Sequence, residues 1–245
     1  MNLERARSFG AAASAYAEHR PDYPADGVRW ALGAASRPVR EVLDLAAGTG
    51  KLTAGLLPLG LTVTAVEPDA GMRAELSRQF PQVKPVAGTA EEIPLPAGSV
   101  DAVLVGQAFH WFDREKALDE IARVLRPGGA VGALWNGEDA GVEWVAGLMA
   151  VTGTSVSGVT TEDLWVPEHA LFEPFEASAF PHTHRRTIDS CAETFGTHSR
   201  MLVIPPDERA TVLARIRSYL AARPETAGGE FDMPLRTRVV RATRR

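Results

Sequence analysis

The stretch Val42-Leu43-Asp44-Leu45-Ala46-Ala47-Gly48-Thr49-Gly50-Lys51 decides the fold of this 245-residue chain. Its apolar first half has the length of a strand, and its glycine turn leads directly into residues 51–59, whose pattern is that of a helix ending at Gly60. In an open parallel sheet, a crevice lies beyond the carboxyl ends of the strands, where small residues let the backbone approach a ligand closely. The stretch therefore predicts the first strand, loop and helix of such a sheet, with a ligand at the loop.

The residues on either side continue this alternation of strands and helices from about Arg40 to Trp135. Further apolar runs of strand length occupy residues 63–66, 83–87, 102–105 and 131–135. Helices are expected over residues 70–80 and after Asp113, with residues 126–129 ending the second of them before the next strand. The pattern is typical of an α/β protein with a doubly wound, mostly parallel sheet.

The composition matches that of a soluble globular protein, since 45% of the residues are hydrophobic and 23% are charged. A formal net charge of -5 disfavours binding to nucleic acid or to an anionic membrane through bulk charge. The single cysteine, Cys191, cannot form an internal disulfide, and the first thirty residues contain no apolar stretch of a signal peptide. No run approaches the roughly 18 apolar residues of a membrane span. These features predict a cytoplasmic enzyme or binding protein without a nucleic-acid or membrane partner.

Three classes of cofactor are bound by loops of this kind, and their spacing rules differ. A phosphate-binding loop requires glycine and lysine followed by serine or threonine, but Gly50-Lys51 is followed by Leu52. A dinucleotide loop prefers glycine or alanine where Thr53 stands, and it does not require an acidic residue at Asp44. A nucleoside without phosphate can use an acidic residue at that place, so the spacing favours this third class.

A second acidic residue, Glu67, ends the predicted second strand. A carboxylate at that place can accept hydrogen bonds from both ribose hydroxyls of a nucleoside that lies across the strand ends. The two carboxylates and the glycine loop together predict a nucleoside pocket.

These residues resemble known motifs of class I S-adenosylmethionine-dependent methyltransferases, in the right order along the chain. The first motif is residues 44–50, and Glu67 resembles the family's acidic ribose ligand. Residues 88–94 resemble its adenine-side loop, residues 100–103 its fourth strand, and residues 123–129 the helix and turn before its fifth strand. The flanking residues 16–24 and 108–113 are similar to those of a narrower group of small-molecule enzymes, the trans-aconitate-methyltransferase-like proteins.

The resemblance implies a Rossmann-like, seven-stranded sheet whose last strand runs antiparallel, and S-adenosyl-L-methionine as the cofactor. We expect a single domain over residues 1–245, with a helical flank or lid at 1–38 that is broken by prolines, and a cofactor-binding core at 40–136. Residues 137–205 should hold a substrate-side insert and the sixth strand, and residues 206–245 the last helix and strand. The residues expected at the cofactor are Asp44, Ala46, Gly48, Gly50, Glu67, Pro68, Ala90, Glu91, Gln107 and Arg20.

Two positions depart from the family's usual pattern. Ala46 stands where glycine is common, so a methyl group must be accommodated in the loop, and Thr89 stands where aspartate is common in the adenine-side loop. Adenine binding then falls to Glu91, to a hydroxyl group or to water.

The resemblance implies methyl transfer to an oxygen or nitrogen nucleophile of a small molecule, and the name of the narrower group points to a carboxylate. Such a displacement depends mainly on holding the nucleophile about 3 Å from the methyl carbon. A hydroxyl or protonated amine also needs a base, for which His110 is the candidate. The residues expected at the acceptor are Tyr16, Tyr23, His110 and Trp111. A nicotinamide-dependent oxidoreductase and a non-catalytic protein that binds S-adenosylmethionine or S-adenosylhomocysteine stay open as alternatives.

Histidine and arginine residues in the second half of the chain raise two further hypotheses. His182, His184, Cys191 and His198 invite a metal site, but a metal needs three or four converging ligands, so no metal is predicted. The arginines of residues 236–245 are interpreted as the solvated edge of a strand rather than as a nucleic-acid surface.

Overall fold

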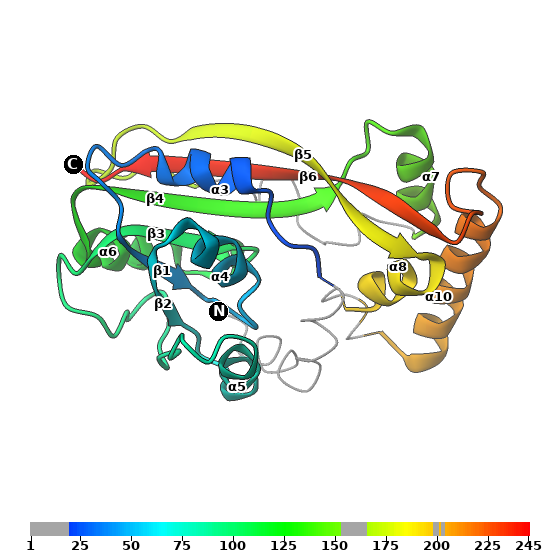
Figure 1. Ribbon diagram of the computed structural model, residues 1–245, viewed down its shortest axis with the longest axis horizontal. Coiled ribbons are helices and arrows are strands. Elements are labelled where there is room, and N and C mark those ends of the chain that lie inside the picture. Colours follow the sequence, from blue (N-terminus) through cyan, green and yellow to red (C-terminus); the bar gives the residue numbers. More distant parts are fainter. Residues whose placement is uncertain (1–19, 153–165, 198–200, 202–203) are drawn as a thin grey trace.

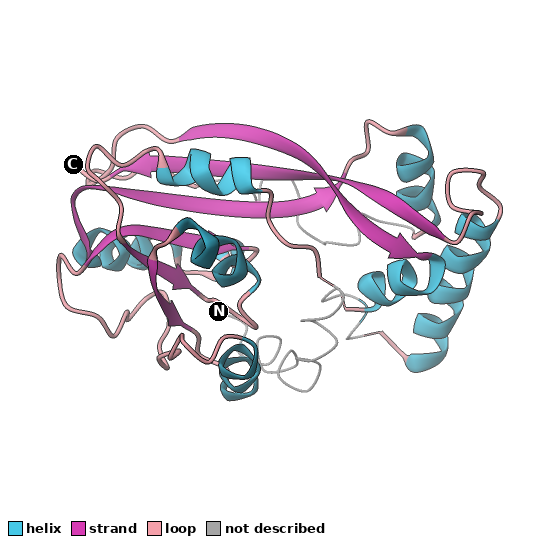
Figure 2. Cartoon of the chain, in the orientation of Figure 1, coloured by secondary structure: helices cyan, strands magenta, loops and turns pink. Residues whose placement is uncertain are grey.

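The computed structural model describes residues 20–152, 166–197, 201 and 204–245. Its described strands form one sheet in the order β2-β1-β3-β4-β6-β5, which Figures 1 and 2 show as the spine of the molecule. Neighbours among β1 to β4 run parallel, whereas β6 is antiparallel to both β4 and β5. The strands are β1 (Glu41–Leu45), β2 (Thr62–Val66), β3 (Val100–Gly106), β4 (Leu125–Glu138), β5 (Glu176–Thr187) and β6 (Glu230–Thr243). The Rossmann-like class and the antiparallel last strand are confirmed.

The described residues form six strands rather than the seven that were expected. Residues 83–87 do not form a strand, because only Val86 pairs with β2, through an isolated bridge to Val66. Val86 donates to the carbonyl of Ala65 and accepts from the N–H of Glu67, but the neighbouring Pro85 has no N–H to extend the ladder.

The helices follow the predicted pattern closely. The helix after the glycine loop ends in a turn of 3-10 helix, and Gly60 closes it with a left-handed φ of 73°. Residues 126–129 were expected to be a turn, but they belong to the irregular start of β4, which is longer than predicted at both ends. The helices are α3 (Ala25–Leu32), α4 (Lys51–Leu56), η2 (Leu57–Leu59), α5 (Ala70–Gln79), η3 (Phe109–Trp111), α6 (Arg114–Val124), α7 (Glu143–Val151), α8 (Ile188–Gly196) and α10 (Pro206–Ala221).

Successive strand residues bury their side chains on opposite faces of the sheet, as a parallel sheet covered on both sides requires. In β3, Val103 and Val105 pack in the cluster that contains the apolar face of α6, whereas Ala102 and Leu104 pack in the cluster that contains α3 and α4. This double coverage explains why the strands of the first half appear in the sequence as nearly continuous apolar runs.

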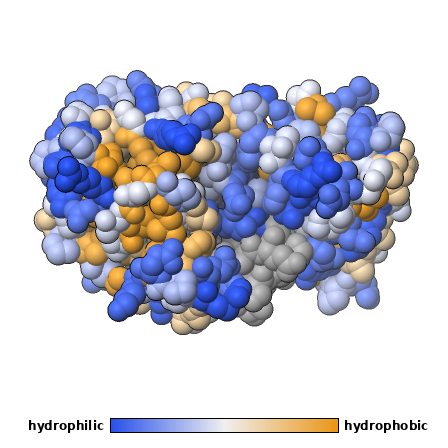
Figure 3. Space-filling model, viewed as in Figure 1, coloured by the Kyte–Doolittle hydropathy of each residue, from blue (hydrophilic) through white to orange (hydrophobic). Residues whose placement is uncertain are grey.

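The helices α7, α8 and α10 form a separate lobe beyond the ends of β4, β5 and β6 (Figure 1). The lobe has its own apolar cluster, in which Leu148, Phe195 and Leu220 are buried together with Phe231 and Met233 of β6. In Figure 3 the visible surface of this lobe is mainly hydrophilic, whereas an apolar area lies over the half of the molecule that holds the parallel strands. Within the described part of the chain, no helix is long and apolar enough to cross a membrane.

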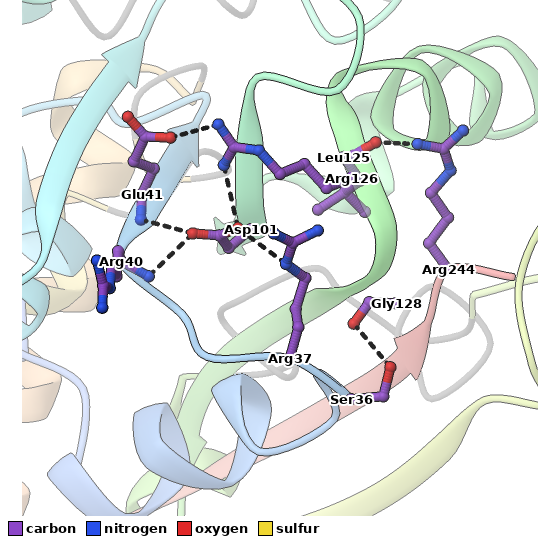
Figure 4. A network of polar contacts seen from close by, with 9 residues as sticks. All are labelled: Ser36, Arg37, Arg40, Glu41, Asp101, Leu125, Arg126, Gly128 and Arg244. Carbon is purple, nitrogen blue, oxygen red and sulfur yellow. Dashed lines mark hydrogen bonds and ion pairs between the residues drawn. The ribbon is translucent and has the colours of Figure 1, made fainter.

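A buried carboxylate, Asp101, joins three segments at the amino ends of the parallel strands (Figure 4). It accepts hydrogen bonds from the backbone N–H groups of Arg40 and Glu41 at 3.0 and 3.1 Å, and its other oxygen contacts Arg126 and Arg37 at 3.0 and 3.2 Å. Burial acts to raise the pKa of Asp101, but the backbone donors and the guanidinium of Arg126 outweigh it and hold the pKa below its ordinary value.

We expect Asp101→Asn to lower the free energy of unfolding at pH 7 by roughly 2 kcal/mol, because the negative charge is lost and one of the two accepting oxygens, each of which binds either arginine or backbone donors, becomes an NH₂ group. A carboxyl with a lowered folded pKa stabilises the protein above its unfolded pKa, and this contribution is lost as the pH falls through the folded pKa. The difference from the wild type, measured by urea unfolding, should therefore shrink towards pH 3. Asp26→Asn, at an exposed ion pair with Arg29, is the control and should change stability little. An equal loss at both pH values contradicts the charge argument.

Candidate functional site

A pocket lies at the carboxyl ends of the four parallel strands, and it extends towards the helical lobe. Its lining includes Ala46 after β1, Glu67 after β2, Gly106 at the end of β3 and Asn136 near the end of β4. This is where a doubly wound sheet binds its ligand. Of the residues expected at the cofactor, those that line the pocket are Arg20, Ala46, Gly48, Glu67, Pro68, Ala90, Glu91 and Gln107.

The glycine loop takes its shape from left-handed backbone conformations. Gly48 and Gly50 have φ values of 57° and 90°, and Ala46 has a φ of 56°, which is costly for a residue with a side chain. A Cβ atom on Gly50 would lie 2.8 Å from the ring of Phe80, so this glycine is needed for packing against the end of α5. Gly50 does not line the pocket, and its role is to shape the loop.

Asp44 lies beneath the loop rather than in the pocket wall. It is fully buried, and the hydroxyl of Thr53 donates to its Oδ2 at 2.6 Å. Burial raises the pKa of Asp44 to about 7, although the bonds to Thr53 act to lower it. Its other oxygen, Oδ1, has no hydrogen-bond partner among the described residues, and the same is true of the buried hydroxyl of Thr49. Two buried polar atoms next to the loop therefore have hydrogen-bonding capacity that the described residues do not satisfy.

Glu67 connects the end of β2 to the glycine loop. Its Oε2 accepts from the N–H of Gly48 and its Oε1 from the N–H of Asp69, both at 2.9 Å. Burial raises the pKa of Glu67, while the two backbone bonds act to lower it. Because each carboxylate oxygen can accept more than one hydrogen bond, both remain able to accept from a pair of ligand hydroxyls.

The side of the pocket next to β2 is formed by Gly88, Thr89, Ala90 and Glu91. A Cβ atom on Gly88 would lie 2.5 Å from Pro94, so glycine permits the tight path of this loop. The carboxylate of Glu91 accepts from the backbone N–H of Asp113 at 3.0 Å and so connects the loop to the start of α6.

The opposite end of the pocket is formed by Gln107 and by the segment that precedes α3. Gln107 has a φ of 58°. In the described part of the chain, Gln107 and Ala46 are the two non-glycine residues with a positive φ. Both line the pocket, and strained backbone of this kind is concentrated at functional sites. Tyr23 lies against Gly106, where a Cβ atom would be 2.5 Å from its hydroxyl oxygen, but it does not line the pocket. Tyr16 lies outside the described residues.

His110 and Trp111 line the pocket from η3, and their rings lie 4.9 Å apart. The indole N–H of Trp135 donates to Nδ1 of His110 at 3.4 Å. In a neutral imidazole, an Nδ1 that accepts leaves the proton on Nε2. In this assigned tautomer His110 can donate to a ligand through Nε2–H, and its role as a base stays a prediction.

The sequence analysis missed the part of the pocket that faces the lobe. The register aligns Glu138 with Leu235 and His182, and Met233 with His184, so alternate residues of β4, β6 and β5 share one face. We call this face the strand extension, and its pocket-lining members are Asn136, Glu138, His184, Arg186, Met233 and Leu235. Only the pairing of β4, β6 and β5 brings these residues together. The positions of helices and strands along the sequence do not predict which strands pair or in which register.

Burial governs the protonation of groups on this side. It raises the pKa of Glu138, and it lowers the pKa of His184 to about 4, with the nearby Arg186 acting in the same direction. It also raises the pKa of Cys191 to about 12, so the thiol is not a nucleophile at neutral pH. Across the described ranges, no group of three or more His, Cys, Asp and Glu side chains converges as a metal site would require, and His198 lies outside those ranges.

The chemistry of the pocket fits a nucleoside better than a dinucleotide. In a dinucleotide site the loop N–H groups face a pyrophosphate, but here the carboxylate of Glu67 accepts from the N–H of Gly48. A second carboxylate, Asp44, lies buried beneath the same loop. A carboxylate that accepts from the loop N–H occupies the donor that a pyrophosphate would need, and its free acceptor capacity favours ligand hydroxyls. The residues present therefore fit S-adenosylmethionine, which carries ribose hydroxyls and a positive charge but no phosphate.

Comparison with known proteins agrees with this geometry. A family model described as "methyltransferase domain" matches residues 43–132. An uncharacterised methyltransferase of Mycobacterium tuberculosis is 41% identical over 237 residues, which cover 96% of this chain and 95% of that protein.

Solved structures share the fold. A protein of Anaeromyxobacter dehalogenans described as a type II methyltransferase has a TM-score of 0.63 at 24% identity, over 92% of this chain and 97% of that chain. The geranyl diphosphate C-methyltransferase of Streptomyces coelicolor, solved with Mg²⁺, geranyl diphosphate and S-adenosylhomocysteine, has a TM-score of 0.50 at 13% identity. That match covers 90% of this chain and 78% of that chain.

Proposed function

Because this chain belongs to the class I S-adenosylmethionine-dependent methyltransferases, we propose that it binds S-adenosylmethionine across its parallel strand ends and methylates a small molecule held against the strand extension. The observation that carries the proposal is the carboxylate of Glu67, which lines the pocket and accepts from the N–H of Gly48. Its two oxygens can each accept a further hydrogen bond, as the two hydroxyls of a ribose require, which supports the proposal. Membership of this family argues against the alternative of a nicotinamide-dependent oxidoreductase.

The protein's part in the reaction is to hold and orient the two reactants and to exclude water from them. When bound, S-adenosylmethionine supplies an electrophilic methyl group on a sulfonium. Glu67 would bind the ribose, the loop of Gly88–Glu91 would enclose the adenine, and Gln107 with Arg20 would lie at the amino-acid end. Asp44 would support the glycine loop from below. An in-line displacement then requires an acceptor atom at about 3 Å, and correct positioning alone supplies much of the acceleration.

The strand extension supports a small acceptor with an anionic group. Two guanidinium groups, Arg20 and Arg186, line the pocket, and Arg186 is buried. Apolar atoms of Trp111, Met233 and Leu235 form the surrounding walls. An oxygen nucleophile on a carboxylate needs no base, so the proposed class of acceptor agrees with a His110 that donates a hydrogen bond.

We expect His110 to hold an acceptor oxygen through Nε2–H. His110→Gln, which can also donate, should retain methyl transfer within about ten-fold of the wild type, whereas His110→Phe should lose more. The measurement is the rate of S-adenosylhomocysteine release with the acceptor found by the screen described next. Loss of a general base should cost roughly a hundred-fold or more in both variants. Equal losses of that size, together with a rate that rises through the histidine pKa, would show that His110 is the base.

The experiment that tests the proposed function is a calorimetric titration of the purified chain with S-adenosylmethionine, S-adenosylhomocysteine and NADH. Binding of the first two without NADH is expected. The protein is then incubated with S-adenosylmethionine and panels of small carboxylates, phenols and amines, and release of S-adenosylhomocysteine is followed. Failure of both adenosyl ligands to bind would overturn the proposal. Cofactor binding without turnover on any panel would favour the non-catalytic alternative.

A further inference from the structure

One residue, Asn136, connects several parts of the pocket that are far apart in the sequence, partly through its side chain and partly through its backbone. It lies near the carboxyl end of β4, and its Nδ2 donates to the carbonyls of Pro21 and Asp22 at 3.3 and 3.1 Å. Its backbone carbonyl accepts from the side-chain amide of Gln107 at 2.8 Å. A single residue therefore contacts two elements of the pocket wall that approach from different directions.

The direction of the Asn136 amide is set by a neighbour on β6. The hydroxyl of Thr237, which is fully buried, donates to Oδ1 of Asn136 at 2.5 Å. Because Oδ1 accepts from this hydroxyl, the NH₂ group faces the carbonyls of Pro21 and Asp22, and the amide has one preferred orientation. Since Thr237 pairs directly with Asn136 in the register of β4 and β6, the sheet itself holds this geometry.

The segment that Asn136 holds is the entrance segment, residues 20–23. Beyond the two bonds from Asn136, the Nζ of Lys51 lies 3.1 Å from the carboxylate of Asp22, and a guanidinium nitrogen of Arg20 donates to the carbonyl of Thr197 at 3.1 Å. Lys51 begins the helix that follows the glycine loop. The entrance segment thus spans from the glycine-loop side of the pocket to the helical lobe, and Arg20 and Pro21 line the pocket.

The second element held by Asn136 is Gln107, which has a left-handed backbone. Such a conformation costs about 1 to 3 kcal/mol for a residue with a side chain, and it persists only where the surroundings enforce it. The backbone N–H of Gln107 donates to the carbonyl of Leu134, and its side chain donates to Asn136, so both of its bonds go to the end of β4. The backbone of Asn136 therefore supports a strained pocket residue, while its side chain holds the entrance segment.

We propose that Asn136 is a positioning residue for the amino-acid end of the cofactor. The inference rests on the proposed function, in which Glu67 and the Gly88–Glu91 loop take the ribose and adenine. The remaining end of the ligand, with its α-amino and α-carboxylate groups, then lies among Gln107, Arg20 and Pro21. Asn136 acts through these neighbours and does not contact the reacting atoms.

The test uses two ligands that differ only at that end. S-adenosylhomocysteine has the amino-acid group, and 5′-methylthioadenosine lacks it. In Asn136→Leu we expect the affinity for S-adenosylhomocysteine to fall roughly ten-fold or more, since the donor bonds to the entrance segment are lost, and the affinity for 5′-methylthioadenosine to change less than about two-fold. Hydrogen exchange of residues 20–23 should speed up in the same variant.

Two variants at Thr237 provide a second test, which does not require Asn136→Leu to fold. Thr237→Val removes the hydroxyl that orients the amide, and Thr237→Ser retains it. We expect Thr237→Val to weaken S-adenosylhomocysteine selectively and Thr237→Ser to bind both ligands like the wild type. If Asn136→Leu does not fold, this pair decides by the same comparison of the two ligands.

The binding results distinguish failure of the positioning role of Asn136 from failure of the proposed function on which that role rests. Failure of the wild type to bind either ligand overturns the proposed function, and the inference with it. Wild-type binding of both ligands, with unchanged S-adenosylhomocysteine affinity in Asn136→Leu and Thr237→Val, overturns the positioning role alone. Equal weakening of both ligands also overturns it, because a loss of pocket structure does not distinguish the two ends of the cofactor.

Discussion

Glu67→Ala is expected to weaken the binding of S-adenosylmethionine by roughly 1.5 to 3 kcal/mol, or about ten- to more than hundred-fold. The substitution removes both proposed acceptors of the ribose hydroxyls. It also leaves the N–H groups of Gly48 and Asp69 without the carboxylate that now accepts from them, so the glycine loop loses a support. The measurement is the dissociation constant by calorimetry, with S-adenosylhomocysteine titrated in parallel.

Glu92→Ala is the matched control for Glu67, because Glu92 is an exposed glutamate that does not line the pocket. It should bind both ligands with wild-type affinity. Glu67→Gln, which retains one acceptor oxygen, should fall between the wild type and Glu67→Ala. Unchanged affinity in a folded Glu67→Ala protein would remove the ribose assignment and the observation on which the proposed function depends.

The second large effect is expected at Asp44, where asparagine should make the ligand-free protein more stable at pH 8. Burial raises the pKa of Asp44 from 3.8 to about 7, so between these values the folded protein binds a proton that the unfolded chain releases. Stability must therefore fall as the pH rises through that window, by as much as about 4 kcal/mol. Asparagine has no charge to bury, and its amide oxygen can still accept from Thr53.

The measurement is urea unfolding of the wild type and Asp44→Asn at pH 5 and pH 8 without ligand. We expect the stability of the wild type relative to Asp44→Asn to decrease between the two pH values. The exposed Asp26→Asn variant should follow the wild type. Parallel pH dependence in the wild type and Asp44→Asn would show that Asp44 does not carry the raised pKa. Binding of S-adenosylmethionine to Asp44→Asn tests the predicted cofactor role of this residue on the same samples.

Local patterns were sufficient for the core of the fold. Apolar runs and helix signals predicted β1, β2, β3, α5 and α6 where the structure has them, because the strands are buried and each helix packs apolar side chains into the core. The predicted strand at residues 83–87 reduces to a bridge at Val86, since Pro85 cannot donate to a ladder. The extra length of β4 and the helix α8 were not predicted, because weakly patterned segments depend on distant partners.

The candidate site likewise has a part that local motifs predicted and a part that only the tertiary structure shows. Glu67 and Gly48 line the pocket as the motif predicts, because motif residues follow directly from the ends of adjacent strands. Asp44 and Gly50 belong to the same motif, but they support the loop from outside the pocket wall, a distinction that spacing does not contain. The strained backbone of Gln107 and the contacts of Asn136 have no local signal, since both depend on which strands lie next to each other.

The sequence by itself determined the class of this protein, the order of its core elements, and the position of the glycine loop with its two acidic residues, one near the end of β1 and one directly after β2. These properties have local signals: a short apolar run, a glycine turn and the residues that end a helix can each be recognised from a few neighbouring residues. Only the tertiary structure decided that β4, β6 and β5 extend past the core to face the pocket with Glu138 and Arg186. It alone placed Asn136 against the entrance segment. Strand register and antiparallel pairing join residues about a hundred positions apart, and no short stretch of sequence carries that information.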